Sequence, residues 1–199
     1  MSGTPHRRSI RLSGYDYSTP GAYFVTICAR GKACVFGEIV GGEMHLNEGG
    51  RIVEAEWTRS AAIRKEIELD AFVIMPNHLH GIVMFTRHAV GGHGPFPREG
   101  LHPRSVGAHG RAPLQRPSRS LGSFIAGFKA SATKRINDLP GTPGRAVWQR
   151  NYYEHVIRDD EDFARIHTYI AENPARWELD EENPRRGGAR QLEESHGRK

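Results

Sequence analysis

The sequence predicts an α+β fold: a ferredoxin-like plait with an antiparallel sheet, helices on one face, and a further helix at the C-terminal end. Two observations predict it. Segments with strand and helix periods follow one another in the order strand, helix, strand, strand, helix, strand, helix. The 199 residues suffice for one domain with a sizeable core, and they contain no internal repeat. This fold class hosts many functions and selects none of them.

The first half of the plait begins with GAYFVTICA at 21–29, where aromatic and β-branched residues predict a buried strand. Residues 35–46 then predict a strand, a glycine turn and a short edge strand. Asn47 offers an N-cap, and the apolar stripe that follows it predicts a helix to about residue 65. Two further strands are predicted at 69–75 and 78–85, with a Pro-Asn turn pair between them.

The second half contains two helices and one strand. Apolar residues at helical spacing predict an amphipathic helix over about 120–138. AVWQRNYYEHVIR at 146–158 predicts a strand with neighbouring irregular structure. DDEDFARIHTYIAEN at 159–173 predicts a last helix, because its acidic first turn suits the helix dipole and its apolar residues fall on one face.

Two segments are expected to lie outside the packed domain. The window 87–119 holds six arginines, one glutamate, six glycines and five prolines, with few large apolar residues, so it predicts a flexible basic insertion. It is either a solvated linker or an arm that touches phosphates. Residues 179–199 have mixed charge and predict a disordered tail. The domain is therefore expected to span 1–178 as a single unit.

The overall charge narrows the classes of partner. A net charge of +5 and a pI near 9.5 favour nucleic acid first and an anionic membrane surface second. No apolar stretch reaches the roughly 18 residues that span a bilayer, and the basic first twenty residues do not resemble a signal peptide. Cys28 and Cys34 form no metal spacing or disulfide framework, which favours a reducing cytoplasm.

The stretch MPNHLHGIVMF at 75–85 places two imidazoles in an apolar run. Residues two apart on a strand point to the same face, so His78 and His80 project together while Leu79 points to the other face. Two neutral imidazoles on one face are good ligands for Mn, Zn, Ni or, less tightly, Mg. The alternative is that each ring is hydrogen-bonded to the backbone, which also satisfies a buried polar ring.

The last helix offers a candidate third ligand. Tyr169 and Asn173 are four residues apart and therefore share one helical face. If this helix lies across the histidine-bearing face, the Asn173 side-chain oxygen becomes a ligand and Tyr169 stands beside the metal. The alternatives are that Tyr169 only packs beside the core and that Asn173 only ends the helix, since Pro174 disfavours helical geometry at the residue before it.

Two stretches, PNHLHGIVMF and NYYEHVIRDDEDFARIHTYIAENPARW, together resemble the REP-associated tyrosine transposases. These are relatives of the transposases of single-strand bacterial insertion sequences, within the HUH (His-hydrophobic-His) endonuclease group. The N-terminal GYDYSTPGAYFVTICARGKACVFGEI fits the same pattern. The similarity covers roughly residues 10–85 and 120–177. The basic insertion is longer than the family pattern leads us to expect.

The resemblance implies a tyrosine transposase, which is an HUH-type single-strand DNA endonuclease and strand transferase. It implies His78, His80 and Asn173 as metal ligands, Mg²⁺ or Mn²⁺ as the cofactor and Tyr169 as the nucleophile. The implied substrate is single-stranded DNA cut beside a hairpin, which leaves a 5′-phosphotyrosine and a free 3′-hydroxyl. A phenol, with a pKa of about 10, ionises more easily than an aliphatic hydroxyl and serves again as a leaving group. One catalytic tyrosine holds one DNA end, so strand exchange needs a homodimer or sequential action.

Substrate binding is expected from basic side chains elsewhere in the chain, with ordinary solvated charge as the alternative. The candidates are Lys129, Lys134, Arg135, Arg150 and the N-terminal HRRSIRL at 6–12. Trp148, Tyr152 and Tyr153 would either stack on unpaired bases or pack in the core. Tyr152 and Tyr153 also leave the nucleophile assignment open.

Two rival functions remain at this stage. The first is a non-catalytic DNA-binding protein of the same fold, specific for a sequence or a hairpin. The second is a metallonuclease whose ion activates water. A structural zinc module is disfavoured because no Cys or His quartet is present.

Overall fold

The computed structural model describes residues 20–86, 119–141 and 143–186. The N-terminal HRRSIRL segment and the basic insertion, apart from Arg119, lie outside the described residues. Residues 179–186, which the sequence analysis assigned to a disordered tail, are described and lie against the rest of the domain. Among the described residues, no helix has the length and apolar character needed to cross a membrane.

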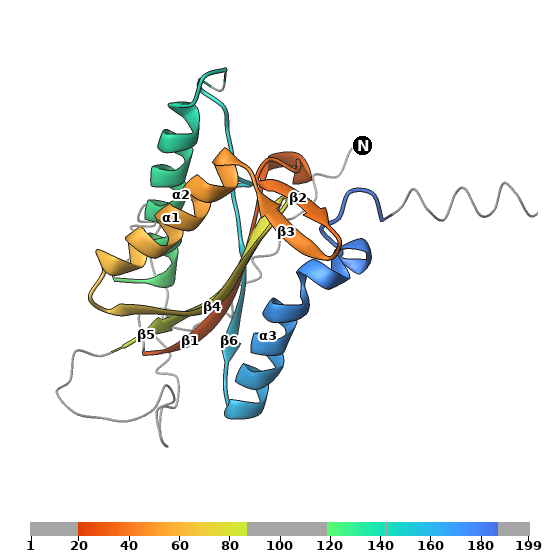
Figure 1. Cartoon of the computed structure of the whole chain (residues 1–199). Helices are drawn as coiled ribbons and strands as arrows, with labels where there is room; N and C mark the ends of the chain where they lie inside the picture. The colour runs from red at the N-terminus through yellow and green to blue at the C-terminus, as the bar shows by residue number, and fades with distance from the viewer. Residues whose placement is uncertain (1–19, 87–118, 142, 187–199) are drawn as a thin grey trace, which may run out of the picture.

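The central sheet has four antiparallel strands in the order β4-β5-β1-β6 (Figure 1). These strands are β1 (Gly21–Cys28), β4 (Ile67–Met75), β5 (His78–Phe85) and β6 (Tyr153–Ile157). A separate two-stranded hairpin consists of β2 (Gly37–Val40) and β3 (Glu43–Leu46). In this sheet, β1 lies between β5 and the last strand, β6, which is the topology of the predicted ferredoxin-like plait. The α+β fold class is therefore confirmed.

The helices cover both faces of this sheet. Helices α1 (Glu48–Ala62) and α2 (Leu121–Asn137) lie on one face, and α3 (Asp160–Glu172) lies on the other (Figure 1). Short 3-10 turns follow β1 and α3, as η1 (Arg30–Lys32) and η2 (Pro174–Leu179). Each α-helix begins where a polar side chain caps a backbone N–H, namely Asn47, Ser120 and Asp159.

The alternation of β1 divides the interior into two cores. Val25 and Ile27 point to the α1–α2 side and join the larger apolar cluster, whereas Ala22 and Phe24 join the cluster under α3. Trp57 of α1 lies directly on the sheet at Gly81, where an added Cβ would come within 2.9 Å of the indole. The histidines of β5 share the α3 side with Phe24, so the site is built on that face.

Candidate metal and tyrosine site

His78 and His80 lie side by side at the end of β5 that pairs with the end of β1. Both are buried, with exposed fractions of 0% and 3%. Their Nε2 atoms are 2.9 Å apart and their ring centroids 4.4 Å apart. The strand period therefore brings the two imidazoles together on one face, as the sequence predicted.

The Asn77 side chain fixes the orientation and tautomer of His78. Its Nδ2 donates to the carbonyl oxygens of Lys32 (3.0 Å) and Glu182 (2.7 Å), so its Oδ1 faces His78 Nδ1 at 2.8 Å. An amide oxygen only accepts, so His78 Nδ1 carries the proton. In the neutral ring, Nε2 then presents a lone pair toward His80, which is the state that a metal ligand requires.

His80 is held by two other groups. Its Nδ1 lies 2.8 Å from Thr26 Oγ1, and its ring stacks on Phe24 with centroids 5.4 Å apart. A hydroxyl can donate or accept, so Thr26 can support either tautomer of His80. In one of them, the His80 Nε2 lone pair also faces the space beside His78.

Burial keeps both imidazoles neutral. It lowers the pKa of His78 from 6.5 to about 3 and the pKa of His80 well below 6.5, and the neighbouring ring acts in the same direction on His80. At neutral pH, neither ring carries a charge that would repel a cation.

Asp180 completes a cluster that can hold a metal ion. Ligand atoms of His78, His80 and Asp180 all lie within 4.8 Å of one another, and Asp180 Oδ2 is 3.7 Å from His78 Nε2. This buried oxygen has no hydrogen-bond partner among the described residues. Burial raises the pKa of the Asp180 carboxyl. A hydrogen bond from the Glu182 backbone acts in the opposite direction, and the charge of Glu182 adds to the rise. Two imidazole nitrogens and one carboxylate oxygen form a mixed donor set that fits a divalent cation.

Asn173 and Tyr169, both named from the sequence, lie in the same pocket as His80 and Asp180. Asn173 keeps the helical conformation at the end of α3 (φ −57°, ψ −43°) even though Pro174 follows it. It is buried, and its Oδ1 has no hydrogen-bond partner among the described residues. A buried amide oxygen of this kind is chemically able to ligate a cation.

The phenol of Tyr169 stands directly beside the histidines. Its Oη is 3.3 Å from His80 Nε2, and the residue is 41% exposed. Burial of the phenol, reinforced by the Asp180 carboxylate, raises the pKa of Tyr169 above 10, while a hydrogen bond with Asn173 acts in the opposite direction. The hydroxyl therefore faces the cation-binding cluster and remains protonated at neutral pH until something lowers its pKa.

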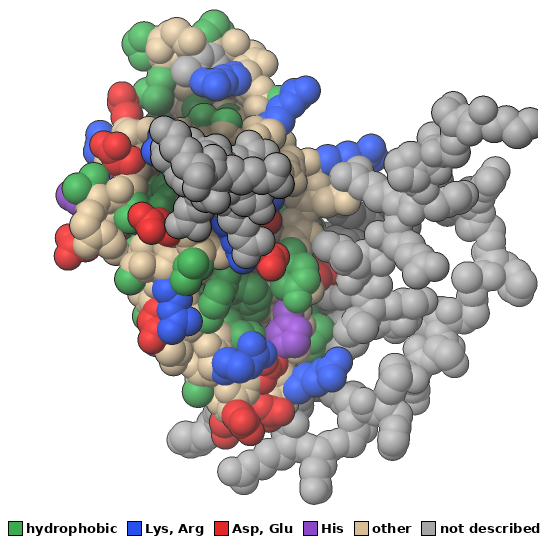
Figure 2. All heavy atoms as spheres, turned by 90° about the vertical axis from the view of Figure 1, so that its right-hand side faces the viewer, with side chains coloured by type: hydrophobic (Ala, Val, Ile, Leu, Met, Phe, Trp, Pro, Cys, Tyr) green, Lys and Arg blue, Asp and Glu red, His purple; other side chains and the backbone are tan. Residues whose placement is uncertain are grey.

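The pocket in front of this cluster has a volume of about 860 Å³. It opens on the α3 side of the molecule, where Figure 2 shows basic and acidic side chains interspersed with apolar ones. Tyr153, Arg165 and Arg176 line it alongside Glu181 and Glu182. The pocket thus has an exposed aromatic ring and two guanidiniums, but Arg165 pairs with Asp162 and Arg176 with Glu172 at 2.8 Å. Further acidic groups come from the C-terminal segment.

The four basic residues proposed from the sequence for DNA binding are not among the residues that line this pocket. Lys129 Nζ donates to the carbonyls of Gln149 and Asn151, both at 2.9 Å, and Arg135 Nη1 contacts the buried Glu56 at 2.8 Å. Lys134 and Arg150 are exposed. Lys129 and Arg135 therefore have structural partners, whereas Lys134 and Arg150 form no ion pair with the residues that the structure describes.

Three residues of the candidate site, Asp180, Thr26 and Asn77, are not predicted from the sequence. Asp180 lies in a segment whose composition suggested disorder, and no local pattern connects it with the histidines. Thr26 shares its face of β1 with Phe24, but only the β1–β5 register places it opposite His80. Asn77 directly precedes the first histidine, and this position could have identified it as a supporting residue, but the Pro-Asn pair predicts only a turn. Trp148 belongs to the core, where it packs on Phe36 and Phe128.

No family model matches this chain. An uncharacterized protein of Haemophilus influenzae is 40% identical over 180 residues, which is 90% of this chain and 94% of that protein. The chain therefore belongs to the same family as this Haemophilus protein.

One solved structure shares the fold. It is a REP-associated tyrosine transposase bound to a REP hairpin, with a TM-score of 0.53 and 17% sequence identity, covering 88% of this chain and 74% of that one. At this level of identity, the likeness establishes a transposase-like fold for the present chain.

Proposed function

We propose that this protein is a metal-dependent, single-strand DNA transesterase: a tyrosine transposase that cleaves and rejoins DNA near hairpins. The observation that carries the proposal is the 3.3 Å approach of Tyr169 Oη to His80 Nε2, within a cluster of buried acceptor atoms. A nucleophilic hydroxyl beside a divalent-cation site is the arrangement that phosphodiester transfer needs. The shared fold with a transposase bound to a hairpin supports the same substrate class.

His78, His80 and Asp180 would hold the cation, with Asn173 as a further ligand. Bound there, a divalent cation such as Mg²⁺ or Mn²⁺ would draw negative charge from the scissile phosphate and from an attacking phenolate. The Asp180 carboxylate gives the ligand set one negative charge, whereas the three ligands named from the sequence are all uncharged. Asn77 and Thr26 keep the imidazoles in place before substrate arrives, which reduces the reorganisation needed during reaction.

Tyr169 would act as the nucleophile. Its phenolic oxygen gives up its proton and forms a bond to phosphorus, and the bond from phosphorus to the 3′ oxygen breaks. The departing 3′ oxygen takes a proton and becomes a free hydroxyl, while the 5′ side stays attached to Tyr169. Attack by a 3′-hydroxyl on this link reverses the step, so rejoining requires no external energy source. The half-exposed ring lets the DNA strand reach the phenolic oxygen.

The partner proposed is single-stranded DNA with a hairpin or repeat element. The net charge of +5 favours such a polyanion. We extend the proposal to a single domain that continues past the predicted boundary at residue 178, because Asp180 and Glu182 contact the histidine cluster and its supports. We also propose a homodimer or sequential action for strand exchange, and a cytoplasmic location. The free thiols of Cys28 and Cys34 suit a reducing compartment.

The test is covalent capture of DNA. The full chain is incubated with a panel of single-stranded hairpins and Mn²⁺ or Mg²⁺, and denaturing gels are searched for a protein–DNA adduct. We expect an adduct with wild type, none with Tyr169→Phe, and none when EDTA removes the metal. Tyr153→Phe is the matched control, because Tyr153 is also an exposed tyrosine of this pocket and should leave the adduct intact.

Two outcomes would replace the proposal. Cleavage by Tyr169→Phe, with a free 5′-phosphate and no adduct in wild type, would indicate a hydrolytic metallonuclease. Hairpin binding by wild type with neither cleavage nor adduct would indicate a non-catalytic DNA-binding protein.

A further inference from the structure

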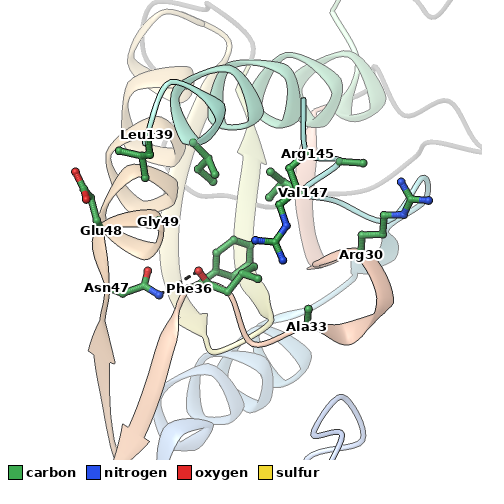
Figure 3. A pocket seen from close by; sticks show the side chains of 12 residues that line it. Arg30, Ala33, Phe36, Asn47, Glu48, Gly49, Leu139, Arg145 and Val147 are labelled. Atoms are coloured by element: carbon green, nitrogen blue, oxygen red, sulfur yellow. Dashed lines mark hydrogen bonds between the residues drawn. The ribbon is translucent and has the colours of Figure 1, made fainter. Parts of the chain in front are cut away.

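A second cavity, of about 340 Å³, lies on the opposite side of the sheet from the histidines. It is bounded by the segment after β1, the start of α1, the end of α2 and residues 145–147 (Figure 3). Its size falls in the range of small-molecule pockets. None of the chemistry described above uses it.

The lining of this cavity combines apolar side chains with two arginines, and the Arg145 side chain extends toward Phe36 (Figure 3). Phe36 and Val147 are buried at its base, and the half-buried Leu139 flanks it. Arg30 and Arg145 are exposed and come from separate segments, yet both line the cavity (Figure 3).

The positive charges of Arg30 and Arg145 are not neutralised by neighbouring acidic side chains in the described part of the chain. Among the described residues, neither Arg30 nor Arg145 has an acidic side chain within 4.0 Å of its guanidinium. Glu48, the acidic residue of the lining, stands on the far side of the cavity from Arg30 (Figure 3). An occupant should therefore have an anionic part beside the arginines and a flat or apolar part over the interior.

We propose that this cavity binds an unpaired nucleotide of single-stranded DNA, with the base over the apolar interior and the phosphates on Arg30 and Arg145. Single-strand binding sites commonly join a positively charged groove to apolar or aromatic surfaces that accept bases. The inference rests on the proposed function in one respect, namely that the ligand is DNA. It adds a subsite on the face away from the histidines.

The charge of this chain argues against self-occupancy. The segments 1–19, 87–118 and 187–199, which lie outside the described residues, each contain more Arg and Lys than Asp and Glu. A basic segment would be repelled by two guanidiniums, whereas a phosphate backbone is attracted. Charge complementarity therefore selects the polyanion as the occupant.

The cavity wall is joined directly to the turn that carries His78. Phe36 N donates to the carbonyl of Pro76 at 3.0 Å, and Ala29 N donates to the carbonyl of Asn77 at 2.7 Å. The cavity and the histidine cluster therefore lie at the same end of the sheet, on opposite faces. A DNA strand bound in the cavity would pass around this end of the sheet to reach Tyr169.

The experiment measures DNA affinity and salt dependence by fluorescence anisotropy, with a labelled mixed-sequence single-stranded 20-mer as the probe. The charge variant is Arg30→Ala/Arg145→Ala, and the occlusion variant is Ala146→Trp, at an exposed lining position. Arg158→Ala is the matched control, because Arg158 is an exposed arginine next to β6, outside both cavities. Thermal melts establish that each variant is folded.

We expect the charge variant to bind roughly tenfold or more weakly near 0.1 M salt, and its plot of log K against log salt to flatten by about 1.4, or 0.7 for each lost phosphate contact. Ala146→Trp should weaken binding without flattening the plot, and Arg158→Ala should change neither. Wild-type affinity in both cavity variants, or an equal loss in Arg158→Ala, overturns the inference.

The covalent assay separates this inference from the proposed function. Adduct formation by wild type depends on Tyr169 and the histidines, whereas the affinity comparison depends on the cavity, so the two measurements are read separately. If wild type forms no adduct, the proposed function fails while the binding data still decide the cavity. If wild type forms an adduct and the cavity variants bind normally, only the cavity inference fails.

Discussion

Acidification from about pH 7.5 to pH 5 should destabilise the metal-free protein by about 2 kcal/mol through His78, with a further loss in the same direction through His80. Both rings are buried and neutral in the fold, so their folded pKa values lie below 6.5. An unfolded chain exposes them to water and binds protons that the folded chain excludes. Stability therefore falls as the pH drops below the unfolded pKa, and for His78 the fall continues toward about 3.

The magnitude follows from the unfolded pKa of 6.5. At pH 5, each exposed imidazole is about 1.5 pH units below that value, and each unit corresponds to about 1.36 kcal/mol. For His78, whose folded pKa of about 3 lies well below pH 5, the cost is therefore about 2 kcal/mol, and His80 adds to it in the same direction. A typical domain has about 5–15 kcal/mol in total, so this loss is a large fraction of its stability.

Among the other groups with shifted pKa values, Asp162 and Glu66 affect stability mainly below this pH interval, and Asp180 affects it with the opposite sign. Asp162 and Glu66 have lowered pKa values, chiefly because arginine or histidine partners outweigh their burial. Their contribution is present above their unfolded values of 3.8 and 4.5 and is lost below them. Asp180 has a raised pKa from burial, so the folded state gains protons there on acidification and the effect has the opposite sign.

The assay is urea unfolding followed by tryptophan fluorescence, in EDTA, at several pH values between about 5 and 7.5. His80→Asn removes one buried imidazole and should show a weaker pH dependence than wild type. Asp180→Asn removes the opposing titration and should steepen it. His45→Asn changes an exposed histidine and should behave as wild type. Equal stability at pH 5 and pH 7.5 in wild type would refute the claim that the site holds two neutral rings.

Three further predictions concern packing and support, each measured by urea unfolding. Asn77→Ala should cost about 1–3 kcal/mol, because two carbonyls lose their donor and His78 loses its acceptor; an unchanged stability would contradict the role of this amide. Gly81→Ala should cost about 1–3 kcal/mol, since its Cβ would meet Trp57 at 2.9 Å. Arg135→Ala should cost about 1–2 kcal/mol by weakening the pairing of the buried Glu56, whereas Lys134→Ala on the next residue should be neutral.

The fold could be predicted because its signals are local. Residues 120–138 were expected to be helical and residues 121–137 are, since apolar spacing and the cap at Ser120 both lie within the segment. The strand at 78–85 matches β5 in full, and its period of two already places both imidazoles on one face.

The candidate site could be predicted only in part. Tyr169 and Asn173 come close to the histidines only if the last helix packs on the histidine-bearing face of the sheet. That packing depends on contacts of the apolar face of α3 with Phe24 and Ile82, which no local pattern specifies. Lys129 illustrates the same limit from the other side. From the sequence, a lysine on an amphipathic helix is a candidate for phosphate contact. In the structure, the Lys129 ammonium group donates instead to the backbone carbonyls of Gln149 and Asn151, which lie in a different segment of the chain.

Asp180 could not be predicted as a site residue because tertiary contacts bring its segment to the histidines. The segment LDEENPRR has few apolar residues, so composition favours disorder. Its order comes from the carbonyl of Glu182, which accepts from Asn77, and from the Glu182 carboxylate, which pairs with Lys32 at 3.1 Å. These partners lie far from Asp180 in the chain, and a local pattern contains no trace of them.

The Pro76-Asn77 turn explains how one short stretch can serve both faces of the sheet. The Asn77 side chain fixes the tautomer of His78 and holds the segment that delivers Asp180, while its backbone carbonyl accepts from Ala29, at the start of the second cavity's wall. A polar residue with 0% exposure is costly unless all of its groups are paired, and here each pairing connects a different part of the molecule. The precision of the histidine site therefore comes from the residue before it as much as from the histidines themselves.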